Sequence, residues 1–135
     1  MDAGEARERF IRAQVARLAT ASADARPHLI PIVFAVARDV LYTAVDAKPK
    51  RSTSLRRLAN IAANPAVAVL VDHYEDDWTR LWWARADGTA RIAEAEEAAT
   101  ALRLLTARYS TYDALPPPGP VIAVDVERWS GWSAT

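Results

Sequence analysis

The 135 residues of this chain include no cysteine. This absence excludes disulfide bonds and metal sites built from thiolates. The N-terminus, MDAGEARERF, also lacks the apolar core of a secretory signal, so we expect a protein of the reducing cytoplasm. No apolar run approaches the ~20 residues needed to cross a bilayer, and we therefore expect no membrane segment.

An excess of charge of one sign is also missing. Lys plus Arg number 17, and so do Asp plus Glu. This balance gives no overall field to draw the protein onto nucleic acid or an anionic membrane, so basic residues matter only where they cluster. The length fits a single domain with one core, spanning residues 1–135.

Several motifs that carry known chemistries are absent. There is no P-loop and no G-x-G-x-x-G turn. His28 has no serine or cysteine in a sharp turn as a partner, so a nucleophilic triad has no support. The loop 72–77 contains four carboxylates and His73, but it lacks the turn glycine of a hard-cation loop and a second histidine. We therefore expect no metal site.

The segment from Lys48 to Pro65, KPKRSTSLRRLANIAANP, is rich in basic residues and opens a predicted helix that ends at Asn64 and Pro65. Backbone amides at a helix start favour anions, and Ser52, Thr53 or Ser54 could cap the helix and donate a hydroxyl. The macrodipole disfavours cations there, so arginines in the first turns indicate a bound phosphate or similar group. The alternative is a solvated basic face. The basic residues are Lys48, Lys50, Arg51, Arg56 and Arg57, with Arg38 upstream and expected outside the site.

Hydrophobic alternation predicts a mainly β protein. An N-terminal helix begins with a capping box of Asp2 and Glu5, a second helix follows the basic segment, and a third covers 94–109. Asp87 and Gly88 mark either a hairpin turn or a bulge in one long strand. Six strands with short links and flanking helices indicate a small antiparallel β-barrel. The expected strands are 15–20, 28–36, 40–45, 66–71, 81–92 and 121–129.

Five tryptophans lie in the C-terminal half. They could bind a flat conjugated ligand, or they could fill the core or a subunit interface. Trp82 and Trp83 are adjacent in a predicted strand, so their side chains point to opposite faces. One of them must face the barrel exterior, where it would meet a partner chain, a ligand or a covering helix.

Four segments in this order resemble a known family: VARLATASADARPHLIPIVFAV, the basic segment ending in NIAANP, LWWARADGTARI, and the terminal WSGW. The chain is similar to the pyridoxamine 5′-phosphate oxidase-like split-barrel flavin-binding proteins, and within them to the branch that uses the deazaflavin coenzyme F-420. The resemblance implies a six-stranded antiparallel split β-barrel with flanking helices, like that of FMN-binding proteins. It also implies a homodimer with cofactor at the subunit interface.

The resemblance assigns roles to individual residues. The phosphate-bearing tail of the cofactor would be held by Lys50, Arg51, Ser52, Arg57 and Asn60. Pro31, Ile32 and Val33 would line the ring, largely through backbone groups. Trp83 would contact the ring from the second subunit, and Trp129 matches an aromatic residue near the ring.

The implied activity is hydride transfer between reduced F-420 and a small electron-poor acceptor that the sequence does not identify. The alternatives are an FMN-dependent oxidoreductase of the same fold and a non-catalytic protein that binds flavin, deazaflavin or haem. The vitamin oxidase activity is disfavoured because no Arg-x-x-x-Arg pattern follows Trp132. No catalytic residue is assigned, and Tyr109, Tyr112 and His28 remain alternative proton donors.

Overall fold

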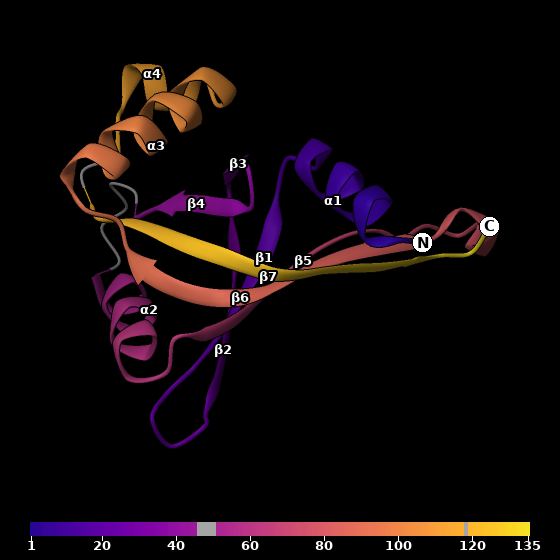
Figure 1. Ribbon diagram of the computed structural model, residues 1–135, viewed down its shortest axis with the longest axis horizontal. Coiled ribbons are helices and arrows are strands. Elements are labelled where there is room, and N and C mark those ends of the chain that lie inside the picture. Colours follow the sequence, from indigo (N-terminus) through magenta and orange to yellow (C-terminus); the bar gives the residue numbers. More distant parts are fainter. Residues whose placement is uncertain (46–50, 118) are drawn as a thin grey trace.

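The structure is a computed structural model that describes residues 1–45, 51–117 and 119–135, of which 51–55 are described by their backbone alone. Within these residues one curled sheet of seven strands forms a half-barrel (Figure 1). The strand order is β2-β1-β5-β6-β7-β4-β3, and every neighbouring pair is antiparallel. The strands are β1 (Ala16–Ala21), β2 (Pro27–Ile32), β3 (Ala35–Ala37), β4 (Val40–Ala44), β5 (Ala66–His73), β6 (Trp82–Ile92) and β7 (Val121–Ser133).

The helices flank this sheet. They are α1 (Ala3–Arg12), α2 (Arg51–Ala63), the 3₁₀ turn η1 (Trp78–Arg80), α3 (Ala95–Arg108) and α4 (Thr111–Ala114). The predicted capping of the first helix is confirmed, since Oδ1 of Asp2 accepts a hydrogen bond of 2.8 Å from the Glu5 amide. None of the described helices is long and apolar enough to cross a membrane. The predicted class, a mainly β fold with a curled antiparallel sheet and flanking helices, is confirmed.

Seven strands replace the predicted six because the stretch 28–36 is divided into β2 and β3. The break falls at Val33 and Phe34, where Arg108, the last residue of α3, and the following Tyr109 form hydrogen bonds to the strand backbone. Tyr109 Oη accepts from the Phe34 amide at 3.2 Å, and Arg108 donates to the Phe34 carbonyl at 2.8 Å. Phe34 itself is fully buried. These two side chains thus take the backbone groups that a continuous strand would offer to a neighbour.

The region of Asp87 and Gly88 is a bulge inside one long strand, and the alternative of a hairpin turn is wrong. β6 and β7 pair along their whole lengths with a register shift between these two residues. A Cβ atom on Gly88 would lie 2.3 Å from the backbone oxygen of Asp125. Glycine is therefore required at this position by close approach of the neighbouring strand.

Two groups of buried side chains lie on opposite faces of the sheet. On one face, Phe10 of α1 and Ile61 of α2 pack with Leu18, Val69 and other strand residues. On the other, α3 and α4 pack against the surface of β3, β4 and β7. Because α1 and α2 share the first face, the opposite surface of β1, β2 and β5 carries no helix among the described elements (Figure 1).

Candidate functional site

A buried polar contact joins α2 to β1. Nδ2 of Asn60 donates a hydrogen bond of 3.0 Å to Oγ1 of Thr20, and both residues are buried, at 5% and 3% exposure. Thr20 pairs with His28 across β1 and β2. Directly paired residues of an antiparallel ladder lie on the same face, so His28 also faces α2. The three residues define the corner between α2 and the β1–β2 pair.

His28 lies in a positively charged environment. Burial lowers the pKa of its imidazole, and the nearby guanidinium groups of Arg56 and Arg57 lower it further. Its Nδ1 atom is shielded from solvent and has no hydrogen-bond partner among the described residues. At neutral pH the ring is therefore uncharged beside two cations. Such a corner could attract an anion, because two guanidinium groups lie near the ring.

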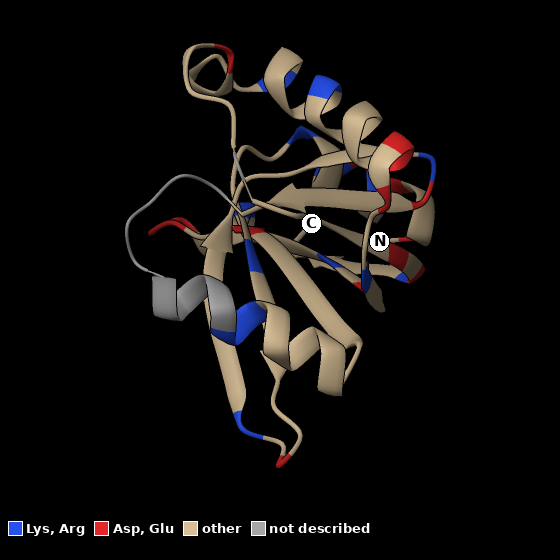
Figure 2. Cartoon of the chain, turned by 90° about the vertical axis from the view of Figure 1, so that its left-hand side faces the viewer, with Lys and Arg blue, Asp and Glu red and all other residues tan. Residues whose placement is uncertain are grey.

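The start of α2 differs in detail from the prediction. The helix begins at Arg51, so Ser52, Thr53 and Ser54 lie within its first turn and not before it. The capping residue of a helix precedes its first helical residue, and these three residues come after Arg51. Figure 2 shows basic residues on α2 directly after the part whose side chains are not described.

The five predicted phosphate ligands are described to different extents. Lys50 lies outside the described residues, and the side chains of Arg51 and Ser52 are not described. Arg57 is half-buried at the corner beside His28. Asn60 is there too, but its amide nitrogen is bound to Thr20. The structure thus brings Arg57 and Asn60 together with His28, and their role toward a ligand stays a prediction.

The predicted ring-contacting residues of β2 face different ways. Ile32 is buried in the core at 6% exposure, whereas Pro31 is exposed on the opposite face. The Val33 carbonyl accepts a hydrogen bond of 2.8 Å from Oγ1 of Thr43. β2 is the first strand in the sheet order, so one edge of its backbone faces no described strand. Unpaired edge groups of this kind can hydrogen-bond a ligand, which agrees with the expectation of contacts through the backbone.

Trp82 and Trp83, which are adjacent in sequence, point to opposite faces of β6, as predicted. Trp82 points toward α1, where the Arg9 guanidinium lies 5.3 Å from its ring centroid. Trp83 points to the other face, pairs with Trp132 of β7, and has the Arg85 guanidinium 5.6 Å from its ring. Trp83 therefore belongs to the surface that no described helix covers.

Trp129 is held by contacts within its own chain. Its ring packs edge-on against Phe10 at 5.3 Å, and its Nε1 donates to Oδ1 of Asp39 at 3.1 Å. The Arg7 guanidinium lies 5.9 Å from the ring. These partners lie on α1 and at the turn between β3 and β4, so Trp129 is not brought to the α2 corner. Arg38 also lies at that turn, and its carbonyl accepts from Arg7.

The alternative proton donors differ in their surroundings. The Tyr109 hydroxyl lies 3.0 Å from the Gln14 carbonyl and 2.9 Å from that of Phe34, so it serves to hold the backbone. Tyr112 is buried in the cluster beneath α3 and α4. Of the three alternatives, only His28 lies at the α2 corner. No sequence motif singled out Thr20. Its position in a predicted strand next to the strand of His28 is the signal that could have placed it at the corner.

The acidic loop makes contacts of its own. His73 bonds to Glu75, which also forms an ion pair of 3.3 Å with Arg80, and Asp77 caps η1 through the Thr79 amide at 3.1 Å. In the described part of the chain, no three histidine or carboxylate side chains are grouped so as to hold a metal ion.

Comparison with known proteins identifies the family. A model of the family described as pyridoxamine 5′-phosphate oxidase matches residues 3–133. The chain belongs to this family. No curated protein matches the chain at a significant level. The family assignment rests on nearly the whole chain, and it agrees with the curled antiparallel sheet.

Solved structures of this shape include proteins with different described roles. A FAD-binding protein from Mesorhizobium loti is 21% identical with a TM-score of 0.75, covering 97% of this chain and 94% of its own. A putative 5-nitroimidazole antibiotic resistance protein from Bacteroides thetaiotaomicron is 17% identical with a TM-score of 0.76, covering 96% and 82%. The haem storage protein HutZ from Vibrio cholerae is 16% identical with a TM-score of 0.74, covering 98% and 95%. At these identities the likeness concerns the fold alone.

Proposed function

We propose that this protein is a cytoplasmic oxidoreductase that binds coenzyme F-420 and transfers a hydride between the reduced deazaflavin and a small electron-poor acceptor. The observation that carries the proposal is the α2 corner, where Arg56 and Arg57 lie near the half-buried ring of His28. Burial is the largest cause of the lowered pKa of His28, and the two guanidinium groups that lower it further would favour a bound anion. Membership of the pyridoxamine 5′-phosphate oxidase family and the fold shared with a FAD-binding protein agree with a flavin-type ligand.

The residues of the corner fit a phosphate group. Arg57 offers a guanidinium that can bind phosphate oxygens through two parallel hydrogen bonds, and Nδ1 of His28 has no protein partner among the described residues. Lys50 and Arg51 would add charge from the start of the helix, and the long anionic tail of F-420 would suit such extra cations. The bound cofactor would supply the hydride chemistry, and the chain would bind and orient it.

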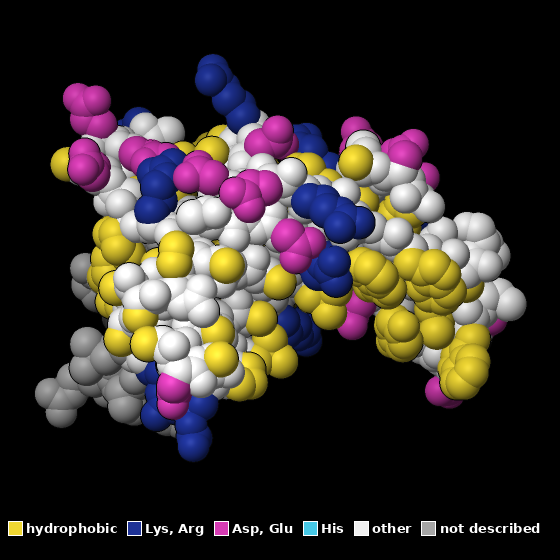
Figure 3. Space-filling model, turned by 60° about the horizontal axis from the view of Figure 1, so that its bottom comes forward, with side chains coloured by type: hydrophobic (Ala, Val, Ile, Leu, Met, Phe, Trp, Pro, Cys, Tyr) yellow, Lys and Arg dark blue, Asp and Glu magenta, His cyan; other side chains and the backbone are white. Residues whose placement is uncertain are grey.

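The ring would lie between two copies of the chain. The uncovered face of the sheet carries apolar side chains among charged ones, and it includes Leu29 at 66% exposure and Trp132 at 43%. Figure 3 shows apolar side chains gathered at the right-hand end of the molecule, where β5 ends and β6 begins in Figure 1. Exposed apolar surface of this kind is typical of a protein interface. Trp83 would then reach the ring bound to the other subunit, beside the edge of β2.

Titration of the purified protein with F-420, FMN and FAD, followed by cofactor fluorescence, tests the proposal. We expect binding of F-420 at micromolar concentration or tighter. The double variant Lys50→Ala and Arg57→Ala should weaken that binding at least about tenfold, which corresponds to about 1.4 kcal/mol. Arg103→Ala, an exposed arginine on α3, is the matched control and should bind as the wild type does.

Two outcomes would contradict the proposal. F-420 whose fluorescence and mobility are unchanged by the protein would rule out the deazaflavin. Equal binding by the wild type and the double variant would show that the phosphate lies elsewhere. Binding of FMN alone would favour the alternative of an FMN-dependent oxidoreductase on the same fold.

A non-catalytic haem-binding role is the second candidate. The observation that favours it is the shared fold with haem-binding proteins, including HutZ and a haem-binding protein from Mycobacterium smegmatis. An axial ligand would have to come from a histidine or a tyrosine, and His28 is the histidine at the α2 corner. Haem titration followed by the Soret band distinguishes this candidate, since a His28→Ala variant would lose the ligated spectrum.

A further inference from the structure

The backbone of Val33 and Phe34 is fixed by side chains instead of by neighbouring strands. These two residues lie between β2 and β3 and belong to neither. Oγ1 of Thr43 donates to the Val33 carbonyl at 2.8 Å, and Arg108 donates to the Phe34 carbonyl at 2.8 Å. The Tyr109 hydroxyl accepts from the Phe34 amide at 3.2 Å. Three side chains therefore set the path of the backbone where β2 ends.

Arg108 and Tyr109 also connect Phe34 to the segment before β1. Arg108 donates to the Ala13 carbonyl, and the Tyr109 hydroxyl lies 3.0 Å from the Gln14 carbonyl. The Arg108 guanidinium lies 4.7 Å from the centroid of the Phe34 ring, and the Phe34 side chain is fully buried. Hydrogen bonds from a charged donor are stronger than those between neutral groups. Phe34 is therefore held through both its backbone and its ring.

The segment that they fix adjoins the free edge of β2. Pro27 and Pro31 have no N–H group, and proline in an edge strand turns its nitrogen away from the neighbouring strand. Alternation along the strand then turns the amides of Leu29 and Val33 to the same edge. β2 is the first strand in the sheet order, and no described group accepts from the Val33 amide. This amide is thus a donor that the edge offers to a ligand.

We infer that Arg108 and Tyr109 are positioning residues of the ring site, which hold the Val33 amide in the geometry that binds the cofactor ring. This inference rests on the proposed function, because it concerns the same site where residues 31–33 would contact the ring. Affinity is higher when the groups of a site are held in their bound geometry before the ligand arrives. Neither side chain needs to touch the ring, since both act through the backbone of Phe34.

Tyr109→Phe removes one hydroxyl and keeps the aromatic ring that packs on Tyr112 at 6.3 Å. The probes are the cofactor that the wild type binds among F-420, FMN and FAD, its phosphate-free ring compound, and inorganic phosphate. We expect the dissociation constants of the cofactor and of the ring compound to rise about threefold to tenfold in the variant. Calorimetry with inorganic phosphate should show no change, because the variant leaves α2 intact.

Arg108→Lys tests the second positioning residue. Lysine keeps the positive charge, but it lacks the planar fork of N–H groups with which Arg108 bonds the carbonyls of Phe34 and Ala13. We expect the same selective loss, with weaker ring binding and unchanged phosphate binding. A loss of phosphate binding as large as the loss of ring binding would show a general effect on the fold and overturn the role of Arg108.

Tyr42→Phe is the matched control. The Tyr42 hydroxyl donates to Glu97 at 2.7 Å, so this variant also removes one hydroxyl bond between the sheet and the α3 region, at a distance from the edge of β2. Urea denaturation measures the loss of stability in both tyrosine variants. We expect Tyr42→Phe to bind all three probes as the wild type does. Equal weakening of ring binding in Tyr42→Phe and Tyr109→Phe would overturn the inference.

Amide hydrogen exchange followed by NMR measures the positioning without any ligand. The Phe34 amide loses its acceptor in Tyr109→Phe, and we expect it to exchange at least about tenfold faster than in the wild type. Tyr42→Phe should leave this rate unchanged. An unchanged rate in Tyr109→Phe would show that the hydroxyl does not hold the segment, and would overturn the inference.

The outcomes of the two proposals are distinguishable. Unchanged ring binding by Tyr109→Phe overturns this inference, even if the wild type binds F-420 or FMN. Failure of F-420, FMN and FAD to bind the wild type overturns the proposed function. Faster exchange of the Phe34 amide in Tyr109→Phe would then still support the fixing of this segment by Tyr109.

Discussion

Asn60 on α2 and Thr20 on β1 are joined by a buried hydrogen bond of 3.0 Å. The bond connects elements 40 residues apart and fixes the turn of α2 that carries Arg56 and Arg57 against the strand pair that carries His28. Sequence resemblance assigns Asn60 to the phosphate of the cofactor. Its amide nitrogen instead has a protein partner, so its effect on binding can be indirect, through the position of the two arginines.

Replacement of Thr20 by valine tests this indirect effect. The change keeps the side-chain shape but leaves the buried Asn60 amide without its acceptor, and we expect a loss of about 1–3 kcal/mol in the free energy of unfolding. Urea denaturation measures this loss. We also expect weaker F-420 binding, because α2 is then held less firmly against β1.

Asn60→Ala completes a double-mutant cycle with Thr20→Val. If the two side chains act as one unit, the double variant should be no less stable than the worse of the two single variants. Strictly additive losses would show that the hydrogen bond contributes little. Unchanged anion affinity in Thr20→Val, together with a large loss in Asn60→Ala, would instead support direct contact between Asn60 and the ligand.

Substitution of Gly88 by alanine tests the bulge in β6. A Cβ atom here would lie 2.3 Å from the Asp125 oxygen and 3.0 Å from its carbonyl carbon. Backbone atoms cannot turn away as a flexible side chain can, so β6 and β7 must separate locally. We expect a loss of more than about 2 kcal/mol in the free energy of unfolding.

Gly4→Ala is the matched control for that substitution. Gly4 lies in the first turn of α1, where an added Cβ would meet only Oδ1 of Asp2 at 3.5 Å, an ordinary contact. Alanine has the higher helix propensity, so this variant should be as stable as the wild type or up to about 1 kcal/mol more stable. Equal stability of the two variants would contradict the close approach at Gly88.

The sequence predicts much of this fold because local signals dominate in most elements. The Asp2 cap, the apolar run of β5, the alternation in β7, and the opposite directions of Trp82 and Trp83 all follow from neighbouring residues. The break between β2 and β3 does not, because it depends on Arg108 and Tyr109, whose side chains reach Phe34 from about 75 residues away. The sequence also could not decide between a hairpin turn and a bulge at Asp87 and Gly88. Only the pairing with β7 shows that the region is a bulge.

The candidate site is predicted less completely, for the same reason. The basic residues of α2 are visible as a charged run, and the family resemblance assigns Arg57 and Asn60 to the phosphate. The corner also depends on Thr20 and His28, which approach α2 only when β1 and β2 pair. A lone histidine beside a proline carries no signal of the two guanidinium groups that change its pKa.

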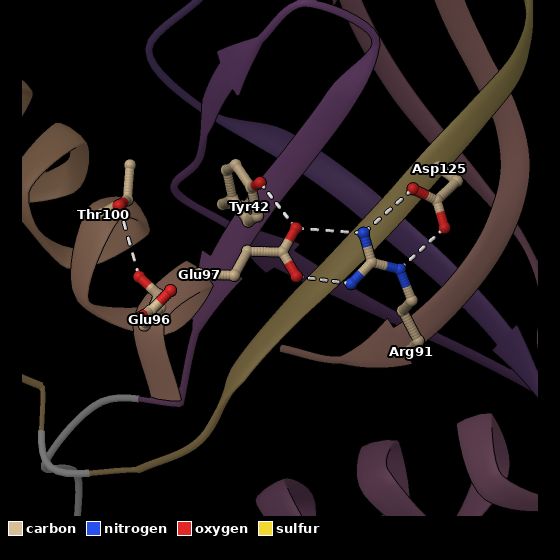
Figure 4. A network of polar contacts seen from close by, with 6 residues as sticks. All are labelled: Tyr42, Arg91, Glu96, Glu97, Thr100 and Asp125. Carbon is tan, nitrogen blue, oxygen red and sulfur yellow. Dashed lines mark hydrogen bonds and ion pairs between the residues drawn. The ribbon is translucent and has the colours of Figure 1, made fainter. Parts of the chain in front are cut away.

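A second polar cluster should determine stability at the extremes of pH. Arg91 of β6 binds Glu97 of α3 and Asp125 of β7, and Tyr42 of β4 donates to Glu97 at 2.7 Å (Figure 4). The hydrogen bonds from Arg91 and Tyr42 lower the pKa of Glu97 to about 2. Burial and the bond to Glu97 raise the pKa of Tyr42 to about 12.

The pKa shifts of Glu97 and Tyr42 affect the free energy of unfolding at opposite ends of the pH range. The lowered Glu97 pKa adds stability above its ordinary value of 4.5, and this contribution is lost as pH falls toward 2. The raised Tyr42 pKa adds stability below its ordinary value of 10.0, and this contribution is lost as pH rises toward 12. The cluster should therefore contribute most between about pH 5 and pH 9.

Glu97→Gln should remove part of both contributions. We expect a loss of about 1 kcal/mol at pH 7, because the pair has bidentate geometry but is partly exposed to solvent. The loss should shrink as pH falls below 4.5, where Glu97 is already being protonated in the unfolded chain. Thermal unfolding at several pH values measures it. Glu96→Gln, the adjacent exposed carboxylate on α3, should show no such pH dependence.

The last prediction concerns the uncovered face of the sheet. Residues paired across antiparallel strands share a face, and the register places Pro31, Arg17, Leu70 and Arg85 in one row across β2, β1, β5 and β6. Leu29 lies on the same face, two residues before Pro31. Because α1 and α2 contact the sheet through its other side, a second copy of the chain is the partner that we propose for this row.

Leu29→Glu should therefore weaken the dimer. A carboxylate in place of Leu29 loses its hydration when the interface closes over it, and we expect the dissociation constant to rise by at least about tenfold, measured by sedimentation velocity. Leu115→Glu is the control, because Leu115 is similarly exposed at 60% but follows α4 on another part of the surface. Since the cofactor ring would sit between subunits, Leu29→Glu should also weaken F-420 binding in proportion to the monomer formed. A wild-type protein that is monomeric at all concentrations would rule out this interface, and F-420 binding by that monomer would show that one chain suffices for the site.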